Sequence, residues 1–96
     1  MKVYAVAMTE VQEDSVLCNS DAAGDWESAV KLAYDFMTRC VGDFLEIDPG
    51  DWAARRAAVE KNVYCEPSVF KGNRKLECHY ECEALVVTTC VQETDL

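Results

Sequence analysis

A strict alternation of apolar and polar residues near the C-terminal end constrains the fold of this chain more than any other feature. Five apolar residues alternate with four polar ones: Leu76, Cys78, Tyr80, Cys82 and Ala84 with Glu77, His79, Glu81 and Glu83. A period of two residues is that of a β-strand, so it predicts one buried and one wet face. The run ALVVTTCV that follows is apolar on both sides. It fits either one long strand or a bend near Glu83 or Ala84.

The N-terminal segment predicts another strand. Residues 3–11 are apolar on both alternating faces, which is typical of a strand near the middle of a sheet. Residues 12–24 hold turn-forming residues around a short apolar triplet. This second segment is compatible with either a short strand or a loop.

A hairpin is predicted just before the alternating segment. Residues 63–70 and those from Arg74 onward are rich in Val, Tyr, Phe and Cys, and residues 71–73 between them suit a tight turn. Because Pro67 has no amide hydrogen for a neighbouring strand, we expect the first arm at a sheet edge or with a bulge.

The first of two predicted helices runs from Trp26 to about Val41. Asp25 is its expected cap, because a carboxylate there can accept the free amide hydrogens of the first turn, and Gly42 suits a left-handed stop. Apolar residues recur at three- and four-residue spacing and form one wide stripe. The stripe consists of Trp26, Ala29, Val30, Ala33, Phe36, Met37, Cys40 and Val41.

The second predicted helix covers residues 49–61, with Asp48 as its cap, proline at its first position and Asn62 at its end. Its apolar stripe is narrow, so it should pack less deeply than the first helix. Together the elements predict a single α+β domain over residues 1–96. We expect an antiparallel sheet of three or four strands in the order β(β)ααββ, with the first helix across one face and the last strand beside the first.

Six cysteines without a recognisable secretion signal favour free, buried thiols over a disulfide framework. The N-terminal apolar stretch ends at Thr9 and Glu10, and no run is long enough to span a bilayer. A cytoplasmic protein is therefore expected. Its cysteines, predicted to be reduced, are Cys18, Cys40, Cys65, Cys78, Cys82 and Cys90.

Zinc-type ligands lie close together in the sequence, but strand geometry argues against a zinc site. Cys78 and Cys82 would lie ~13 Å apart along a strand, whereas two ligands of one zinc lie within about 4 Å of each other. The single histidine, His79, points to the face opposite Cys78, which disfavours a thiol–imidazole pair. We therefore expect no metal, no cofactor and no catalytic residue, and we favour a non-enzymatic function.

The acidic residues are concentrated in one part of the chain. Between Glu10 and Asp51, eleven carboxylates are opposed only by Lys31 and Arg39, which accounts for the whole net charge of −9. A surface of this sign repels the phosphate backbone of nucleic acids and attracts basic proteins. The candidate partner-binding residues are Glu10, Glu13, Asp14, Asp21, Glu27, Asp35, Asp43 and Glu46.

These observations favour a small acidic binding protein that inhibits or modulates a partner by occupying its basic surface in place of phosphates. The expected partner is a basic, nucleic-acid-processing protein, and direct contact with nucleic acid or membrane is not expected. Small acidic proteins of phages and mobile elements, such as anti-CRISPR inhibitors and nuclease-immunity proteins, share this size and charge, which is an analogy of class without a shared motif. Two alternatives are a cysteine-based redox or catalytic protein, and a structural or accessory subunit whose acidity serves solubility only.

Overall fold

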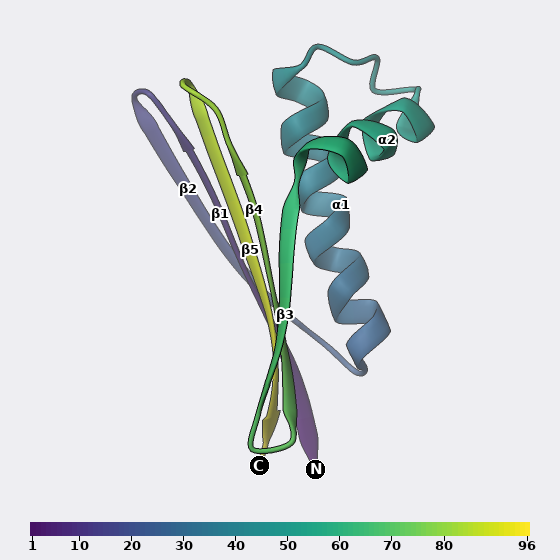
Figure 1. Cartoon of the computed structure of the whole chain (residues 1–96), viewed down its shortest axis with the longest axis vertical. Helices are drawn as coiled ribbons and strands as arrows, with labels where there is room; N and C mark the ends of the chain where they lie inside the picture. The colour runs from purple at the N-terminus through teal and green to yellow at the C-terminus, as the bar shows by residue number, and fades with distance from the viewer.

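Residues 76–81 of the alternating segment lie in β4 (Asn73–Glu81), one of five strands in the computed structural model, which describes residues 1–96, and residues 82–84 lie in the turn that follows. The other strands are β1 (Lys2–Gln12), β2 (Ser15–Ala23), β3 (Tyr64–Phe70) and β5 (Leu85–Asp95). All neighbours pair antiparallel in the order β2-β1-β5-β4-β3. The helices α1 (Trp26–Phe44) and α2 (Trp52–Asn62) lie on one side of this sheet (Figure 1). The predicted α+β class with an antiparallel sheet is confirmed.

The predicted number of three or four strands is too low, since the structure has five, and the element order is ββααβββ. Residues 15–23, whose sequence is compatible with either a strand or a loop, pair with β1 along their whole length. The apolar run after Glu83 is a separate strand, β5, since the chain reverses at residues 82–84 and the amide of Cys82 donates to the carbonyl of Leu85 at 2.9 Å. Of the two alternatives predicted for this run, one long strand or a bend near Glu83 or Ala84, the bend is confirmed.

The last strand pairs with the first, as predicted, and β5 is the central strand of the sheet. Their register runs from Lys2 opposite Asp95 to Gln12 opposite Leu85. At the far edge, β3 and β4 form the predicted hairpin around residues 71–72, whose φ angles of 51° and 79° match the two-residue turn that suits twisted strands. β3 is an edge strand, as Pro67 indicated.

Helix α1 begins where the sequence predicts and ends later. Asp25 accepts hydrogen bonds from the amide and hydroxyl of Ser28, which confirms it as the cap. Gly42 does not stop the helix. The left-handed residue is Glu46 at φ 58°, and the amide of Ile47 donates back to the carbonyl of Gly42 at 3.0 Å, which closes the helix by a Schellman-type turn.

Helix α2 begins three residues later than predicted. Asp51, not Asp48, is its cap, and it accepts from the amide of Ala54 at 3.0 Å. Asp48 instead accepts from the amide of Gly50 within the connecting turn. The helix buries only Arg55 and Val59, so it does pack less deeply than α1.

The hydrophobic core lies between α1 and the inner face of the sheet. Met37 at 1 % exposure and Val41 at 0 % are its most enclosed large α1 side chains, whereas Trp26 and Val30 of the predicted stripe are only partly buried. The sheet and α2 contribute Val6, Met8, Cys78, Tyr80, Leu85, Val87, Val91 and Val59. The predicted stripe is therefore buried from Ala29 to Val41, with Trp26 and Val30 at its partly exposed margin.

The outer face of the sheet carries no helix, and we call it the open face (Figure 1). Residue alternation and register place the following side chains there: Val3, Ala5, Ala7, Thr9 and Val11 of β1; Val16, Cys18, Ser20 and Ala22 of β2; Val86, Thr88, Cys90, Gln92 and Thr94 of β5; and Lys75, Glu77, His79 and Glu81 of β4. The charged groups of this face are those of β4 and Glu66 of β3, which lies opposite Glu77, so the part formed by β2, β1 and β5 is uncharged.

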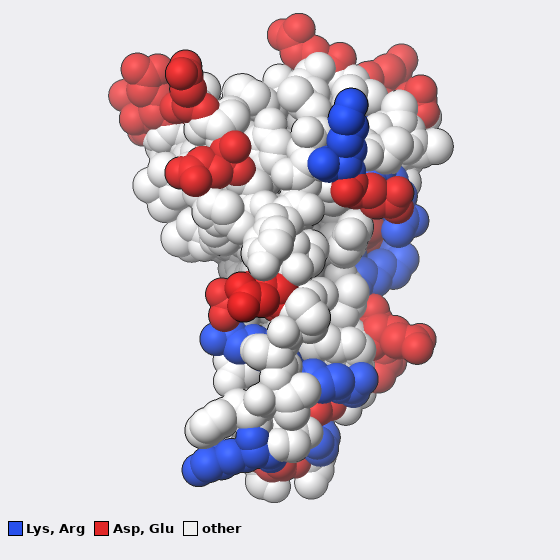
Figure 2. All heavy atoms as spheres, in the orientation of Figure 1, with Lys and Arg blue, Asp and Glu red and all other residues white.

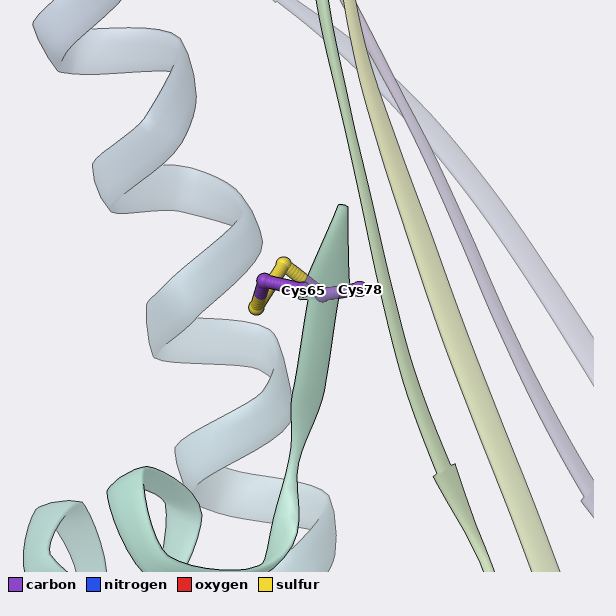
Figure 3. Close-up of a disulfide and its surroundings, with 2 residues drawn as sticks. All are labelled: Cys65 and Cys78. Atoms are coloured by element: carbon purple, nitrogen blue, oxygen red, sulfur yellow. A yellow bond between two sulfur atoms is a disulfide. The ribbon is translucent and has the colours of Figure 1, made fainter. Parts of the chain in front are cut away.

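A disulfide joins Cys65 of β3 to Cys78 of β4 on the side of the sheet that faces α1 (Figure 3). The prediction that every cysteine is reduced is wrong at this pair. That prediction rested on the cellular compartment alone, whereas the register places these two residues directly opposite each other with Cα atoms 4.1 Å apart. The other four cysteines are free thiols.

Reduction should lower the stability of the domain, because the disulfide links Cys65 to Cys78 in the unfolded chain as well and so lowers the conformational entropy of the unfolded state. We expect Cys65→Ala to cost about 2–3 kcal/mol in the free energy of unfolding and roughly 10 °C or more in melting temperature. Thermal melts followed by circular dichroism, with and without reductant, measure the effect. Cys18→Ala, an exposed free thiol, is the control. Identical melting of oxidised and reduced wild-type protein would contradict the disulfide.

Candidate protein-binding surface

Carboxylates from three separate turns gather at one end of the molecule, which we call the acidic end (Figure 2). β1, α1 and β4 all run toward it, so the turns that follow them lie at this end, with the two sheet turns side by side and the α1–α2 connection apart from them (Figure 1). Five of its carboxylates form no ion pair: Glu13, Asp14, Glu46, Asp48 and Glu83. The acidic end consists of Glu13, Asp14, Asp43, Glu46, Asp48 and Glu83.

The opposite end of the molecule is rich in cations and surrounds the β3–β4 turn and the two chain termini (Figures 1 and 2). Arg74 and Lys2 form ion pairs with Glu93, at 2.9 Å and 3.3 Å, and the guanidinium of Arg74 lies over the ring of Trp26. The hydrogen bond from Arg74 is the main cause that holds the pKa of Glu93 down at about 2. The acidic turns and the cation-rich turn therefore lie at opposite ends of the long axis, which is 41 Å.

The structure brings four of the eight candidate carboxylates together and separates the others. Glu13, Asp14, Asp43 and Glu46 lie at the acidic end. Glu27 lies in the first turn of α1, at the other end of that helix. The remaining three lie between the two ends: Glu10, Asp21 and Asp35.

Asp21 of β2 and Asp35 of α1 line a groove of about 380 Å³ between the edge strand and the helix. Its apolar lining comes from Met8, Leu32 and Phe36. Asp35 is paired with Lys31 at 2.7 Å, and Asp21 accepts from the amide of Ala22. The groove is open, and Arg39 of α1 also lines it, with its guanidinium 5.5 Å from the centre of the Phe36 ring.

Glu10 lies on the helix side of β1, partly buried beside Cys40 of α1. Burial and the neighbouring Glu10 carboxylate raise the pKa of the Cys40 thiol to about 12. Burial also raises the pKa of Cys90. A reactive cysteine needs its thiolate near neutral pH, so neither environment favours nucleophilic chemistry.

Arg55 belongs to the interior and not to a basic surface. Arg55 and Arg56 are adjacent cations in the sequence, but the side chain of Arg55 is only 3 % exposed. It donates to the carbonyls of Arg39 and Ile47 and forms an ion pair with Asp43 at 2.8 Å. A Cβ atom on Gly42 would lie 2.6 Å from its side chain, so the glycine leaves room for this arginine to cross the end of α1.

The side chains that zinc binding would need are not brought together. No group of three or more His, Cys, Asp and Glu side chains is placed to hold a metal ion. His79 is exposed on the open face, 3.5 Å from Glu81, while Cys78 is in the disulfide on the other face. No helix has both the length and the apolar character needed to cross a membrane.

Two members of the acidic end, Asp48 and Glu83, were outside the predicted set. The sequence carries no simple signal for them, because α2 interrupts the up-and-down alternation of the chain, so that counting connections does not show which turns share an end. Comparison with protein families, with characterised proteins and with solved structures finds no match to this chain. Its function must therefore be argued from its own residues.

Proposed function

We propose that this protein binds a basic surface of another protein through its acidic end. The observation that carries the proposal is the convergence of carboxylates from three turns on one end, where five of the six form no ion pair. Isolated exposed charges contribute little to affinity, but a single-sign patch steers encounter and selects a partner of opposite charge. Inhibition or modulation of a nucleic-acid-processing protein is the function that fits this chemistry.

The backbone at Glu46 supports a functional role for this end. Glu46 occupies the left-handed conformation that ends α1, where glycine is the usual residue. A non-glycine residue there costs about 1 kcal/mol, and such costs concentrate at functional sites. A carboxylate held in this position, between the capped ends of α1 and α2, is presented on a rigid support.

The groove beside β2 extends the same surface. It adds two carboxylates, Asp21 and Asp35, and an apolar lining to the purely electrostatic contact at the acidic end. The alternative of a redox or catalytic protein has less support, because the raised pKa of Cys40 and Cys90 disfavours their thiolates.

A direct test compares two triple variants of equal net charge. The first is Glu13→Gln, Asp14→Asn and Glu83→Gln at the acidic end, and the second is Glu27→Gln, Glu60→Gln and Glu66→Gln elsewhere. The probe is a synthetic arginine-rich peptide, with its dissociation constant measured by fluorescence anisotropy at low and at physiological salt. We expect the acidic-end variant to bind about tenfold more weakly, since each lost charge removes roughly 0.5 kcal/mol.

The control variant should bind nearly as the wild type does. Binding should also weaken as salt rises while circular dichroism stays constant, because exposed charges are screened within about 8 Å at physiological salt. If both triple variants lose affinity equally, net charge alone attracts the peptide. The acidic end would then not be a site.

A further inference from the structure

The open face formed by β2, β1 and β5 lacks the pattern of a solvated sheet face. In a protein of net charge −9, none of its side chains is charged; they are small aliphatic, hydroxyl, thiol and amide groups. Antiparallel sheets with one face in water usually carry polar and charged residues there, as β4 does with Glu77 and Glu81. A contiguous uncharged sheet face of this kind marks a surface that packs against another layer.

The size of this face is adequate for a stable contact. Three strands of up to eleven residues cover roughly 500 Å² at a strand spacing of about 4.8 Å and a rise of about 3.4 Å per residue. Two such faces would bury roughly 1,000 Å² in total, which is the lower bound for a specific interface, and the adjoining row on β4 adds to it.

The charged residues of β4 indicate that a second copy of this chain packs on the open face. Its open-face residues read Lys75, Glu77, His79 and Glu81 along the strand. If a second copy lies antiparallel, related by a two-fold axis level with Cys78, Glu81 of one copy faces Lys75 of the other. The same axis places His79 opposite Glu77. This row is therefore complementary to itself in one orientation only.

The apolar residues fit the same orientation. The same two-fold axis places Val11 of one copy over Ala5 of the other, and Val16 over Ala22. Pairing large with small side chains lets two faces interdigitate at the usual spacing of about 10 Å between packed sheets. The antiparallel arrangement also sets the acidic end of each copy beside the cation-rich end of its neighbour.

We propose that two copies of this chain pack open face to open face, antiparallel, to form a symmetric dimer. This inference does not depend on the proposed binding of a basic partner, because the acidic end is distinct from the open face. Sedimentation equilibrium of the wild-type chain over a concentration series should give a reversible monomer–dimer equilibrium. A mass that stays monomeric at the highest concentration reached would overturn the proposal.

Two sets of variants test the surface and its orientation. Ala7→Glu, at an exposed site in the middle of the face, should abolish the dimer while circular dichroism stays unchanged. Lys75→Glu and Glu81→Lys should each weaken dimerisation about tenfold, and the double variant should restore it. If net charge alone governed association, Glu81→Lys would strengthen it. A dimer that tolerates Ala7→Glu, or a double variant without recovery, would overturn the arrangement.

Discussion

Replacing Met37 with aspartate should leave the domain unfolded at 25 °C. Met37 is 1 % exposed and lies in the one buried cluster of the protein, where α1 covers the sheet. A carboxylate there has neither water nor a cation, and burying an unpaired charge costs several kcal/mol in addition to the lost apolar contacts. A domain of this size has a total stability of about 5–10 kcal/mol, so the substitution removes most or all of it. Circular dichroism and urea titration measure the loss.

Asp35→Asn is the matched control, two residues away on the same helix. Asp35 is partly exposed, and its ion pair with Lys31 is a surface pair four residues apart, worth about 0.3–0.5 kcal/mol. Its loss should change the melting temperature by only a few degrees. If the two variants were equally stable, the packing of α1 on the sheet through Met37 would be wrong.

Arg55→Ala should cost about 3 kcal/mol in the free energy of unfolding. The guanidinium satisfies the carbonyls of Arg39 and Ile47 at the end of α1 and pairs with Asp43, so its removal leaves buried acceptors without donors. It also opens a cavity beside Gly42. Urea denaturation followed by tryptophan fluorescence, with extrapolation to water, measures the change.

Arg56→Ala separates this packing role from charge. Arg56 is exposed on the same helix, so its replacement removes the same charge and should change stability by less than about 0.5 kcal/mol. Arg55→Lys should fall between the two, since an ammonium group cannot reproduce the planar fork of donors. Equal effects of Arg55→Ala and Arg56→Ala would show that only charge matters at this helix.

Features with a local cause could be predicted from the sequence. The hairpin around residues 71–72, the cap at Asp25 and the strand at 76–81 each depend on a few neighbouring residues. β2 could not be predicted as a strand, because almost all of its residues are exposed and leave no pattern of burial.

Features that depend on distant residues could not be predicted. The helix continues through Gly42 because Arg55, thirteen residues further on, packs against that glycine. The disulfide requires the register of Cys65 with Cys78. The acidic end requires the chain order that places three connections together, so only four of the eight candidate residues lie there.

The pairing of β1 with β5 has a consequence for how the chain folds. The central ladder joins the first strand to the last, from Lys2 opposite Asp95 onward, so the contacts that complete the sheet are the most distant in the sequence. Closing so long a loop is entropically costly, and folds dominated by such contacts form slowly. The β1–β2 and β3–β4 hairpins can form early, but during synthesis α1 has no complete sheet to cover until β5 leaves the ribosome. Until then, one side of β1 is an unpaired edge, which makes this interval the one in which the protein is most exposed to misassociation.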